Sequence, residues 1–291
     1  MEWRNRLGET VSAGDEQDKG LNFLYNSAFG RFLLRLIIRK PVSDLAGWFL
    51  ERRVSTVFIK GFLRNSGIDM SEYENVRYRS FNDFFTRRIR PECRPIDNDP
   101  EHFISPCDCK MTVFRIGSDS VFSIKGCDYT IGQLLRSEAL ADSFAGGWLL
   151  VFRLTVSDYH RYCFPDGGKK EKNVHIQGVY HTVNPIAFGR YAVFRENTRE
   201  YTLLHSDHFD DIVIMEVGAT LVGRIANLHP GGCRVEKGAE KGHFDFGGST
   251  VAVLVKPHVL RVDEDILRNN ADGAETIIRY GERIGVKSEE H

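Results

Sequence analysis

The 291-residue chain has no apolar run that approaches the ~18 residues a helix needs to span a bilayer. Its first twenty residues lack the apolar segment of a secretory signal peptide and include five acidic residues, which are rare in transit peptides. These absences argue against a membrane-spanning protein and against an exported one. We therefore expect the protein to start and stay on the cytoplasmic side of the membrane.

Net charge is also nearly absent, since 39 basic and 40 acidic side chains give −1 at pH 7. A general nucleic-acid binder normally carries a strongly basic balance, so we expect no nucleic-acid partner. The six cysteines are too scattered for the disulfide framework of a small secreted domain, and Cys107-Asp108-Cys109 lacks the Cys-x-x-Cys spacing of zinc ribbons. No glycine loop of the P-loop or dinucleotide type is present. The sequence predicts reduced thiols, no metal and no external cofactor.

Basic residues are in local excess in residues 21–64, where eight basic and two acidic side chains give a local net charge of +6. From Phe29 to Ile38 apolar residues recur with helical spacing, and Arg31, Arg35 and Arg39 lie on another face. A second helix is predicted from Ser43-Asp44 to about Leu63. Basic amphipathic helices of this kind either lie on an anionic membrane surface or pack on the protein with their arginines in water.

After about residue 92 the chain changes to short β-type runs separated by Gly, Asp and Pro. The predicted strands are 111–116, 120–124, 148–155, 191–194, 211–217 and 250–255, and the predicted helices in this part are 131–141 and 265–269. Strands do not alternate with long helices, which argues against a doubly wound parallel sheet. The sequence thus predicts an α+β fold in which a helical N-terminal third packs on a mostly antiparallel β core. We expect a helical, membrane-associating region at 1–92 and a β-rich catalytic domain at 93–291.

The dipeptide Gly248-Ser249, within Gly247-Gly248-Ser249-Thr250, has the composition of a self-cleavage site. Glycine has no Cβ, so the following hydroxyl can approach its carbonyl in conformations closed to other residues. A hydroxyl becomes a useful nucleophile only when a neighbouring base takes its proton. Gly, Ser and Thr also form ordinary turns, so this motif alone leaves a plain loop as the alternative.

His160 is the candidate base, because it follows the predicted strand 148–155 at the point where a strand end can present a side chain. Asp108, in Ser105-Pro106-Cys107-Asp108, is the candidate carboxylate that would orient the imidazole. Serine, histidine and aspartate in these roles are the components of a hydrolase triad. Taken singly, His160 also fits a surface histidine and Asp108 a turn after proline.

Seven segments follow one another in order between about residues 75 and 256. They are Ser80-Phe81-Asn82-Asp83-Phe84-Phe85, Arg94-Pro95-Ile96-Asp97, Ser105-Pro106-Cys107-Asp108, Asp158-Tyr159-His160-Arg161, Val183-Asn184-Pro185, Val217-Gly218-Ala219-Thr220-Leu221-Val222-Gly223, and Lys241 through Thr250. Together they resemble the phosphatidylserine decarboxylase family, in particular its clostridial-type branch.

The resemblance implies a proenzyme in which the Ser249 hydroxyl attacks the Gly248 carbonyl, giving an ester that eliminates to dehydroalanine and hydrolyses to a pyruvoyl group. His160 would take the Ser249 proton and Asp108 would hold the imidazole in the right tautomer. Residues 1–248 and 249–291 would then stay associated as two chains. The pyruvoyl group would act as the electron sink that converts phosphatidylserine to phosphatidylethanolamine.

The same resemblance implies an enzyme that is peripheral on the cytoplasmic face of the cell membrane, in contact with anionic phospholipid; whether it forms a homodimer is left open. Many members carry a second histidine, often the triad base, where this chain has Cys163. His160 is therefore the expected base, and His181 is the reserve candidate for a base or a headgroup contact, although it also fits a packed strand histidine. Cys109 stands where Gly is usual, and Gly247 where Leu is commoner.

Two other kinds of protein remain as alternatives. Residues 235–242 are similar to the turns of lipoyl- and biotin-carrying β domains, which would leave Ser249 uncut. A serine hydrolase could use Asp108, His160 and Ser249, but its usual Gly-x-Ser-x-Gly elbow is missing.

Overall fold

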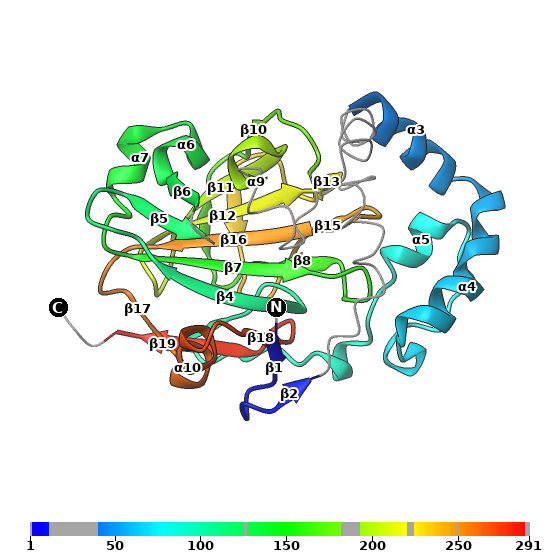
Figure 1. The fold of residues 1–291 in the computed structure, drawn as a ribbon, viewed down its shortest axis with the longest axis horizontal. Helices are drawn as coiled ribbons and strands as arrows, with labels where there is room; N and C mark the ends of the chain where they lie inside the picture. The colour runs from blue at the N-terminus through cyan, green and yellow to red at the C-terminus, as the bar shows by residue number, and fades with distance from the viewer. Residues whose placement is uncertain are drawn as a thin grey trace.

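The computed structural model describes residues 2–11, 40–124, 127–181, 193–219, 224–247 and 249–288. As the sequence predicts, the fold is mixed α+β and its sheets are mostly antiparallel; its helices are few and short and lie mainly in the N-terminal region. Helices α3 (Lys40–Leu50) and α4 (Val57–Ser66) lie at one side of the β body (Figure 1). The helix predicted at residues 29–38 lies outside the described residues. No helix in the described part of the chain is long and apolar enough to cross a bilayer.

The single helix predicted from Ser43-Asp44 to Leu63 is wrong, because the chain breaks between α3 and α4. Arg52 is extended, with φ −86° and ψ 149°, and a 3-10 turn η1 (Arg53–Thr56) follows. The Ser55 hydroxyl donates to the carbonyls of Leu50 and Arg52, so a side chain takes the place of the amides that would continue the helix. The short elements that follow are η2 (Met70–Glu72), α5 (Phe81–Phe85) and η3 (Pro91–Cys93).

Within the described residues eleven strands form the main sheet. In spatial order they are β14 (Cys233–Val235), β9 (Gly168–Lys170), β11 (Arg199–Ser206), β12 (Asp211–Gly218), β16 (Ser249–Val255), β7 (Trp148–Leu154), β4 (Cys109–Arg115), β18 (Glu275–Ile278), β1 (Trp3–Arg4) and β2 (Thr10–Val11), with β10 (Val174–Ile176) beside β11. Neighbours are antiparallel except β1 and β18. The strand β16 is therefore paired on both sides, with β12 and with β7.

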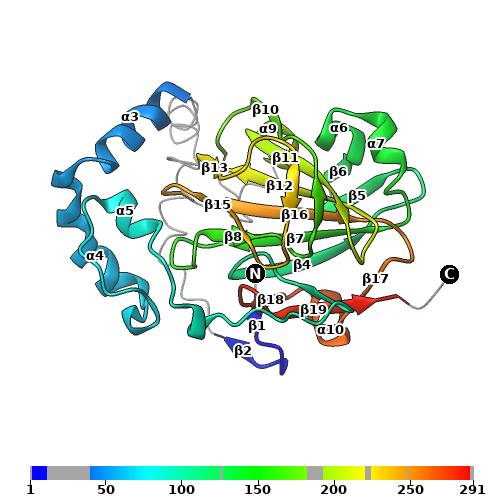
Figure 2. The ribbon, with the colours of Figure 1, turned by 180° about the vertical axis from the view of Figure 1, so that it is seen from behind.

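Smaller elements cover the two faces of this sheet. They are the sheet β13 (Ile225–Asn227), β15 (Glu240–Phe244) and β8 (Arg161–Cys163); the sheet β17 (Leu260–Val262), β19 (Arg283–Lys287) and β3 (His102–Ile104); the hairpin β5 (Val121–Ile124) and β6 (Cys127–Thr130); and helices α6 (Ile131–Leu135), α7 (Glu138–Asp142), α9 (Val193–Glu196) and α10 (Glu264–Ala271). Figure 2 shows α6 and α7 at one end of the body and α3 and α4 at the other.

Most of the expected β elements are confirmed. The strands predicted at 111–116, 120–124, 148–155, 211–217 and 250–255 are β4, β5, β7, β12 and β16, and the helix predicted at 265–269 is α10. The single helix predicted at 131–141 is divided into α6 and α7, because Arg136 has a left-handed backbone with φ 52°. The strand predicted at 191–194 is wrong, because Val193 begins helix α9; residues 191 and 192 lie outside the described part. A run of four mixed apolar residues carries too little periodicity to separate a strand from a helical turn.

The central strands are buried on both faces, which explains their nearly continuous apolar sequences. On β12, Val213 and Met215 pack in one core cluster with α6 and α7, whereas Ile212 and Ile214 pack in the other, with β8, β15 and α10. Directly paired residues share a face of the sheet. Ser249 is paired with Leu154, a member of the second cluster, so its side chain lies on that second face.

A separate aromatic cluster joins the N-terminal helices to the segment that precedes Ser249. Phe81, Phe84 and Phe85 of α5 are buried and pack against α3 and α4 on one side. On the other side the ring of Phe246 lies 5.1 Å from that of Phe81 and 5.0 Å from that of Phe85, both edge to face. The helical region is thus packed directly against the predicted cleavage segment.

Candidate active site

Ser249 is the first residue of β16, and its side chain is fully buried. It lies between Gly218 of β12 and Leu154 of β7, and its hydroxyl donates to the Gly247 carbonyl at 3.5 Å, a long hydrogen bond. Gly247 has a φ of 144°, a backbone conformation that is open to glycine and strained for other residues. Its neighbour Gly248 lies outside the described residues.

The backbone before Ser249 is held by Asn82, the second residue of α5. The Asn82 amide nitrogen donates to Asp245 Oδ1 at 3.0 Å, and its oxygen accepts from the Phe246 backbone N–H at 3.0 Å. Ser80 fixes this short helix by accepting from the Asp83 N–H as its N-cap. The role of Asn82 could not be predicted, because the local pattern indicates a capped helix and not the residues that the side-chain amide contacts.

His160 is fully buried and its two ring nitrogens differ in environment. Nδ1 lies 2.9 Å from the Asp158 carbonyl oxygen, and a carbonyl can only accept, so Nδ1 carries the proton. Nε2 is then the unprotonated nitrogen of the neutral ring, and it has no hydrogen-bond partner among the described residues. This is the tautomer that a general base at Nε2 requires.

Burial lowers the pKa of His160 from 6.5 to about 4, with Arg87 and Lys110 adding to the effect and Asp158 opposing it. The imidazole is therefore neutral at physiological pH. Its ring centroid lies 4.1 Å from that of Phe85, which also contacts Phe246. One phenylalanine thus joins the predicted base to the segment that carries the predicted cleavage point.

Asp108 is buried, but it does not contact His160 in the described part of the chain. Arg94 Nε and Nη2 donate to its two oxygens at 2.9 and 2.7 Å, and the Tyr280 backbone N–H donates at 2.7 Å. The predicted contact between Asp108 and the His160 imidazole is therefore not formed. The Asp108 carboxylate binds Arg94 instead, and the imidazole donates to the Asp158 carbonyl.

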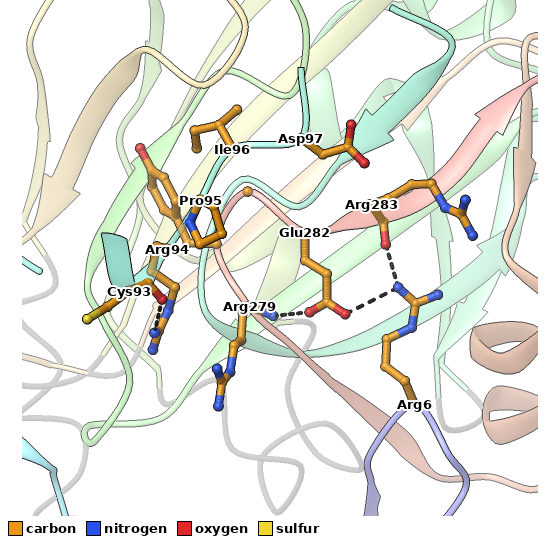
Figure 3. Close-up of a pocket in the computed structure, with 11 residues that line it drawn as sticks. Arg6, Cys93, Arg94, Pro95, Ile96, Asp97, Arg279, Glu282 and Arg283 are labelled. Atoms are coloured by element: carbon orange, nitrogen blue, oxygen red, sulfur yellow. Dashed lines mark hydrogen bonds and ion pairs between the residues drawn. The ribbon is translucent and has the colours of Figure 1, made fainter. Parts of the chain in front are cut away.

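Asp108 and Arg94 adjoin a pocket of about 550 Å³ (Figure 3). Its wall combines Arg94 and Cys93 with Tyr280 and the turn before β19. Glu282 also lines it and accepts from the Arg279 backbone N–H and from Arg6 (Figure 3). Because Arg6 and Arg94 are both paired with carboxylates, most of the positive charge of this wall is compensated.

The reserve histidine His181 is linked to the other side of Ser249. Asn197 accepts from the His181 N–H and donates to the carbonyls of His181 and Gly218, and Gly218 is the strand partner of Ser249. The His181 Nε2 lies 3.5 Å from Glu196. Burial lowers the pKa of His181, with Glu196 opposing, so this ring also favours its neutral form.

Two further side chains with shifted pKa values are Cys163 and His243. Cys163, at the position of the absent second histidine, is buried, and burial raises its pKa to about 12, so it stays a thiol. His243 of β15 was given no role, yet burial lowers its pKa, and its Nδ1 has no hydrogen-bond partner in the described residues. Its position in the segment Lys241 through Thr250, six residues before Ser249, is the sequence signal that could have identified it.

Comparison with known proteins bears on this site. The family model described as phosphatidylserine decarboxylase matches residues 81–286. Phosphatidylserine decarboxylase proenzyme 2 of Clostridium acetobutylicum is 45% identical over 267 residues, which is 91% of each chain. The phosphatidylserine decarboxylase proenzyme of Clostridium botulinum strain Hall is 41% identical over 275 residues, or 93% of each chain. That of Ruminiclostridium cellulolyticum is 39% identical over 270 residues, or 91% of this chain and 90% of its own.

Proposed function

Because this chain belongs to the phosphatidylserine decarboxylase family, we propose that Ser249, His160 and Asp108 form the centre at which it matures and acts. The enzyme is made as a proenzyme and converts phosphatidylserine to phosphatidylethanolamine in phospholipid biosynthesis. Its pyruvoyl group arises from a serine on cleavage, and we assign that serine to Ser249. The family match sets aside the serine-hydrolase and carrier alternatives.

The proposal rests on a buried serine at the start of a central strand and on a buried neutral histidine that packs on Phe85, which in turn contacts Phe246 three residues before that serine. In the maturation step His160 Nε2 takes the hydroxyl proton while Ser249 Oγ bonds to the Gly248 carbonyl carbon, and the proton passes to the Ser249 nitrogen as the peptide C–N bond breaks, which leaves an ester and a free amine. Loss of the Cα proton then releases Gly248 as a carboxylate and leaves dehydroalanine, which water converts to the ketone with release of ammonia. The intact mass of the purified protein tests this, since cleavage gives chains 1–248 and 249–291.

The surroundings of Ser249 suit a pyruvoyl group. The side chain is fully buried on the face of the sheet that carries the second core cluster, and its strand partner Leu154 is a member of that cluster, so water is excluded. Once formed, the group supplies the electron sink for loss of carbon dioxide. His160, with a lone pair at Nε2, can hold a proton there and return it to the product carbon.

We assign Asp108 a positioning role through Arg94. Replacing Asp108 with Asn should slow self-cleavage by about tenfold, because the partly buried Arg94 guanidinium loses its bidentate partner and the turn beside Tyr280 loosens. The same substitution in a Ser249→Ala background should lower the melting temperature by several degrees. A matched control is Asp142→Asn, which changes an exposed aspartate of α7. Unchanged cleavage and melting in the Asp108 variant would remove it from the site.

We further propose that residues 1–92 dock the enzyme on the cytoplasmic face of the membrane, with residues 93–291 as the catalytic domain. The support is a surface of exposed apolar side chains on α3, η1 and α4, here called the docking surface. It consists of Leu45, Trp48, Phe49, Val54, Val57 and Phe58. Arg52 lies over the Trp48 ring at 4.5 Å, so positive charge accompanies the apolar surface. An anionic lipid surface complements both properties, and the substrate is itself an anionic lipid.

The double variant Trp48→Ser/Phe58→Ser should bind phosphatidylserine vesicles at least tenfold more weakly, because each exposed ring loses about 1.5 kcal/mol or more of transfer free energy. The loss should persist at high salt, since screening does not act on apolar transfer. Vesicle co-sedimentation measures it. The control Val174→Ser/Leu228→Ser removes exposed apolar side chains elsewhere, and an equal loss there would contradict the assignment of the docking surface.

A further inference from the structure

A second hollow of about 550 Å³ lies on the helical region, between η1 with the start of α4 and residues 77–79. Its lining residues are Arg53, Thr56, Arg77, Tyr78 and Arg79. The three guanidinium groups come from two segments that are more than twenty residues apart in the sequence. The fold therefore gathers like charges that no local pattern brings together.

This hollow carries positive charge that the described residues do not compensate. Arg79 lies 3.6 Å from Asp83, but Arg53 and Arg77 have no acidic partner in the described part of the chain. Of the four arginines that line the other pocket, Arg6 and Arg94 each bind at least two carboxylates and Arg283 binds Asp263. Arginines without carboxylate partners that line one hollow suit a phosphate group, to which a guanidinium donates charge-assisted hydrogen bonds.

The residues next to the lining in the chain indicate which kind of phosphate-containing molecule suits the hollow. Val54, Val57 and Val76 directly neighbour Arg53, Thr56 and Arg77 in the chain, and they are 59%, 69% and 52% exposed. Val54 and Val57 belong to the docking surface. A phospholipid places its phosphate next to glycerol and acyl carbons, whereas an inorganic phosphate ion has no apolar part. A membrane lipid therefore suits a cationic hollow whose neighbours in the chain are exposed apolar side chains.

We propose that this hollow, the Arg53–Arg77 pocket, binds the phosphodiester group of a membrane phospholipid and so sets the orientation of the enzyme on the bilayer. The proposal rests on the docking surface proposed above, because the pocket reaches a lipid phosphate only when α3 and α4 meet the membrane. This binding differs from a diffuse attraction to anionic surfaces, because a phosphodiester is also present in zwitterionic lipids, which carry no net charge. The pocket should therefore contribute to binding on zwitterionic membranes as well.

The test compares two double variants that remove the same charge from the same helical region. Arg53→Gln/Arg77→Gln empties the pocket of its unpaired guanidinium groups, and Lys60→Gln/Arg64→Gln removes two exposed basic side chains of α4 outside it. Binding is measured by co-sedimentation with vesicles of phosphatidylcholine alone and with added phosphatidylserine, at 0.15 M and 1 M salt. Equal melting temperatures establish that both variants fold.

The pocket variant should bind both kinds of vesicle about tenfold more weakly at both salt concentrations, because charge-assisted hydrogen bonds to a lipid phosphate are lost. The control should weaken only on phosphatidylserine vesicles at 0.15 M, where screening is incomplete. The same pattern in both variants would reduce the pocket to diffuse charge and overturn the proposal.

Soluble probes separate the remaining outcomes. Dihexanoyl phosphatidylcholine below its micelle concentration should bind the parent protein and not the pocket variant in a calorimetric titration. Inorganic phosphate that binds in its place, with vesicle binding unchanged in the variant, would assign the pocket to a free ion and overturn the proposal. The Trp48→Ser/Phe58→Ser variant should retain dihexanoyl phosphatidylcholine binding. If the docking-surface proposal alone is wrong, the Trp48→Ser/Phe58→Ser variant will bind vesicles as the parent does, and the titration of the parent with dihexanoyl phosphatidylcholine will still show binding.

Discussion

Ser249→Ala should remain a single 33.2 kDa chain without decarboxylase activity, whereas the parent separates under denaturing conditions into two pieces. The smaller piece, residues 249–291, should have a mass of about 5 kDa in proportion to its length. The expected loss of cleavage rate is at least about 10⁴-fold, because the variant has no oxygen with which to attack the Gly248 carbonyl. Intact mass spectrometry measures both species.

The N-terminus of the smaller piece should also resist Edman degradation, since a ketone replaces its amine. Ser249→Thr is a useful comparison because it keeps a hydroxyl in the buried position and adds one methyl group. It should cleave slowly, as the added methyl is crowded beside Gly218 and Leu154. A parent enzyme that is fully active as one uncut chain would refute the assignment of Ser249.

His160→Ala should accumulate uncut proenzyme, with cleavage slowed by about 10²- to 10⁴-fold, the usual contribution of a general base. The reason is that His160 Nε2 is the buried imidazole nitrogen without a partner that shares the Phe85 wall with the cleavage segment. His181→Ala and His243→Ala are matched controls that remove two other imidazoles whose pKa values are also lowered by burial. Normal maturation of the His160 variant, with a block in one of these, would transfer the role of base to that residue.

The pH dependence of cleavage in the parent tests the same assignment. A base acts when unprotonated, and the pKa of His160 is lowered to about 4, so the rate should be flat from pH 8 to about pH 5 and fall to half near pH 4. A solvent-exposed histidine would instead halve the rate near pH 6.5. Cell-free synthesis of the proenzyme at neutral pH, followed by a rapid shift of pH, allows the rate to be followed. A midpoint near 6.5 would contradict the buried base.

The strands of the core could be predicted because their sequences are apolar on both faces and are bounded by polar turns. The order of those strands could not. Trp3 pairs beside Glu275, and Val251 pairs with both Glu216 and Phe152, and such contacts depend on packing between segments that are far apart in the chain. The break at Arg52 was also missed, since a serine that competes for backbone carbonyls leaves helical spacing intact.

At the site, Ser249, His160 and Asp108 could be named because each lies in a short motif. Their partners could not be named in the same way. Asn82 contacts Asp245, 163 residues away in the sequence. The His160 imidazole donates to the backbone carbonyl of Asp158, and a backbone acceptor is not revealed by any residue type. Arg94 was part of a matching segment, but only the folded chain shows that its guanidinium saturates the carboxylate expected to serve the histidine.

The place of β16 in the middle of the main sheet changes the molecularity of folding once the chain is cut. Before cleavage, β16 and its partners β12 and β7 belong to one polypeptide, so folding is unimolecular. After cleavage, the central strand belongs to the smaller chain, together with β17, β18, β19 and α10. Refolding of the mature enzyme then requires two molecules to meet and depends on concentration. Maturation is therefore kinetically one-way: the proenzyme folds as one chain before it is cut, whereas a mature enzyme that unfolds must refold by the slower association of two chains.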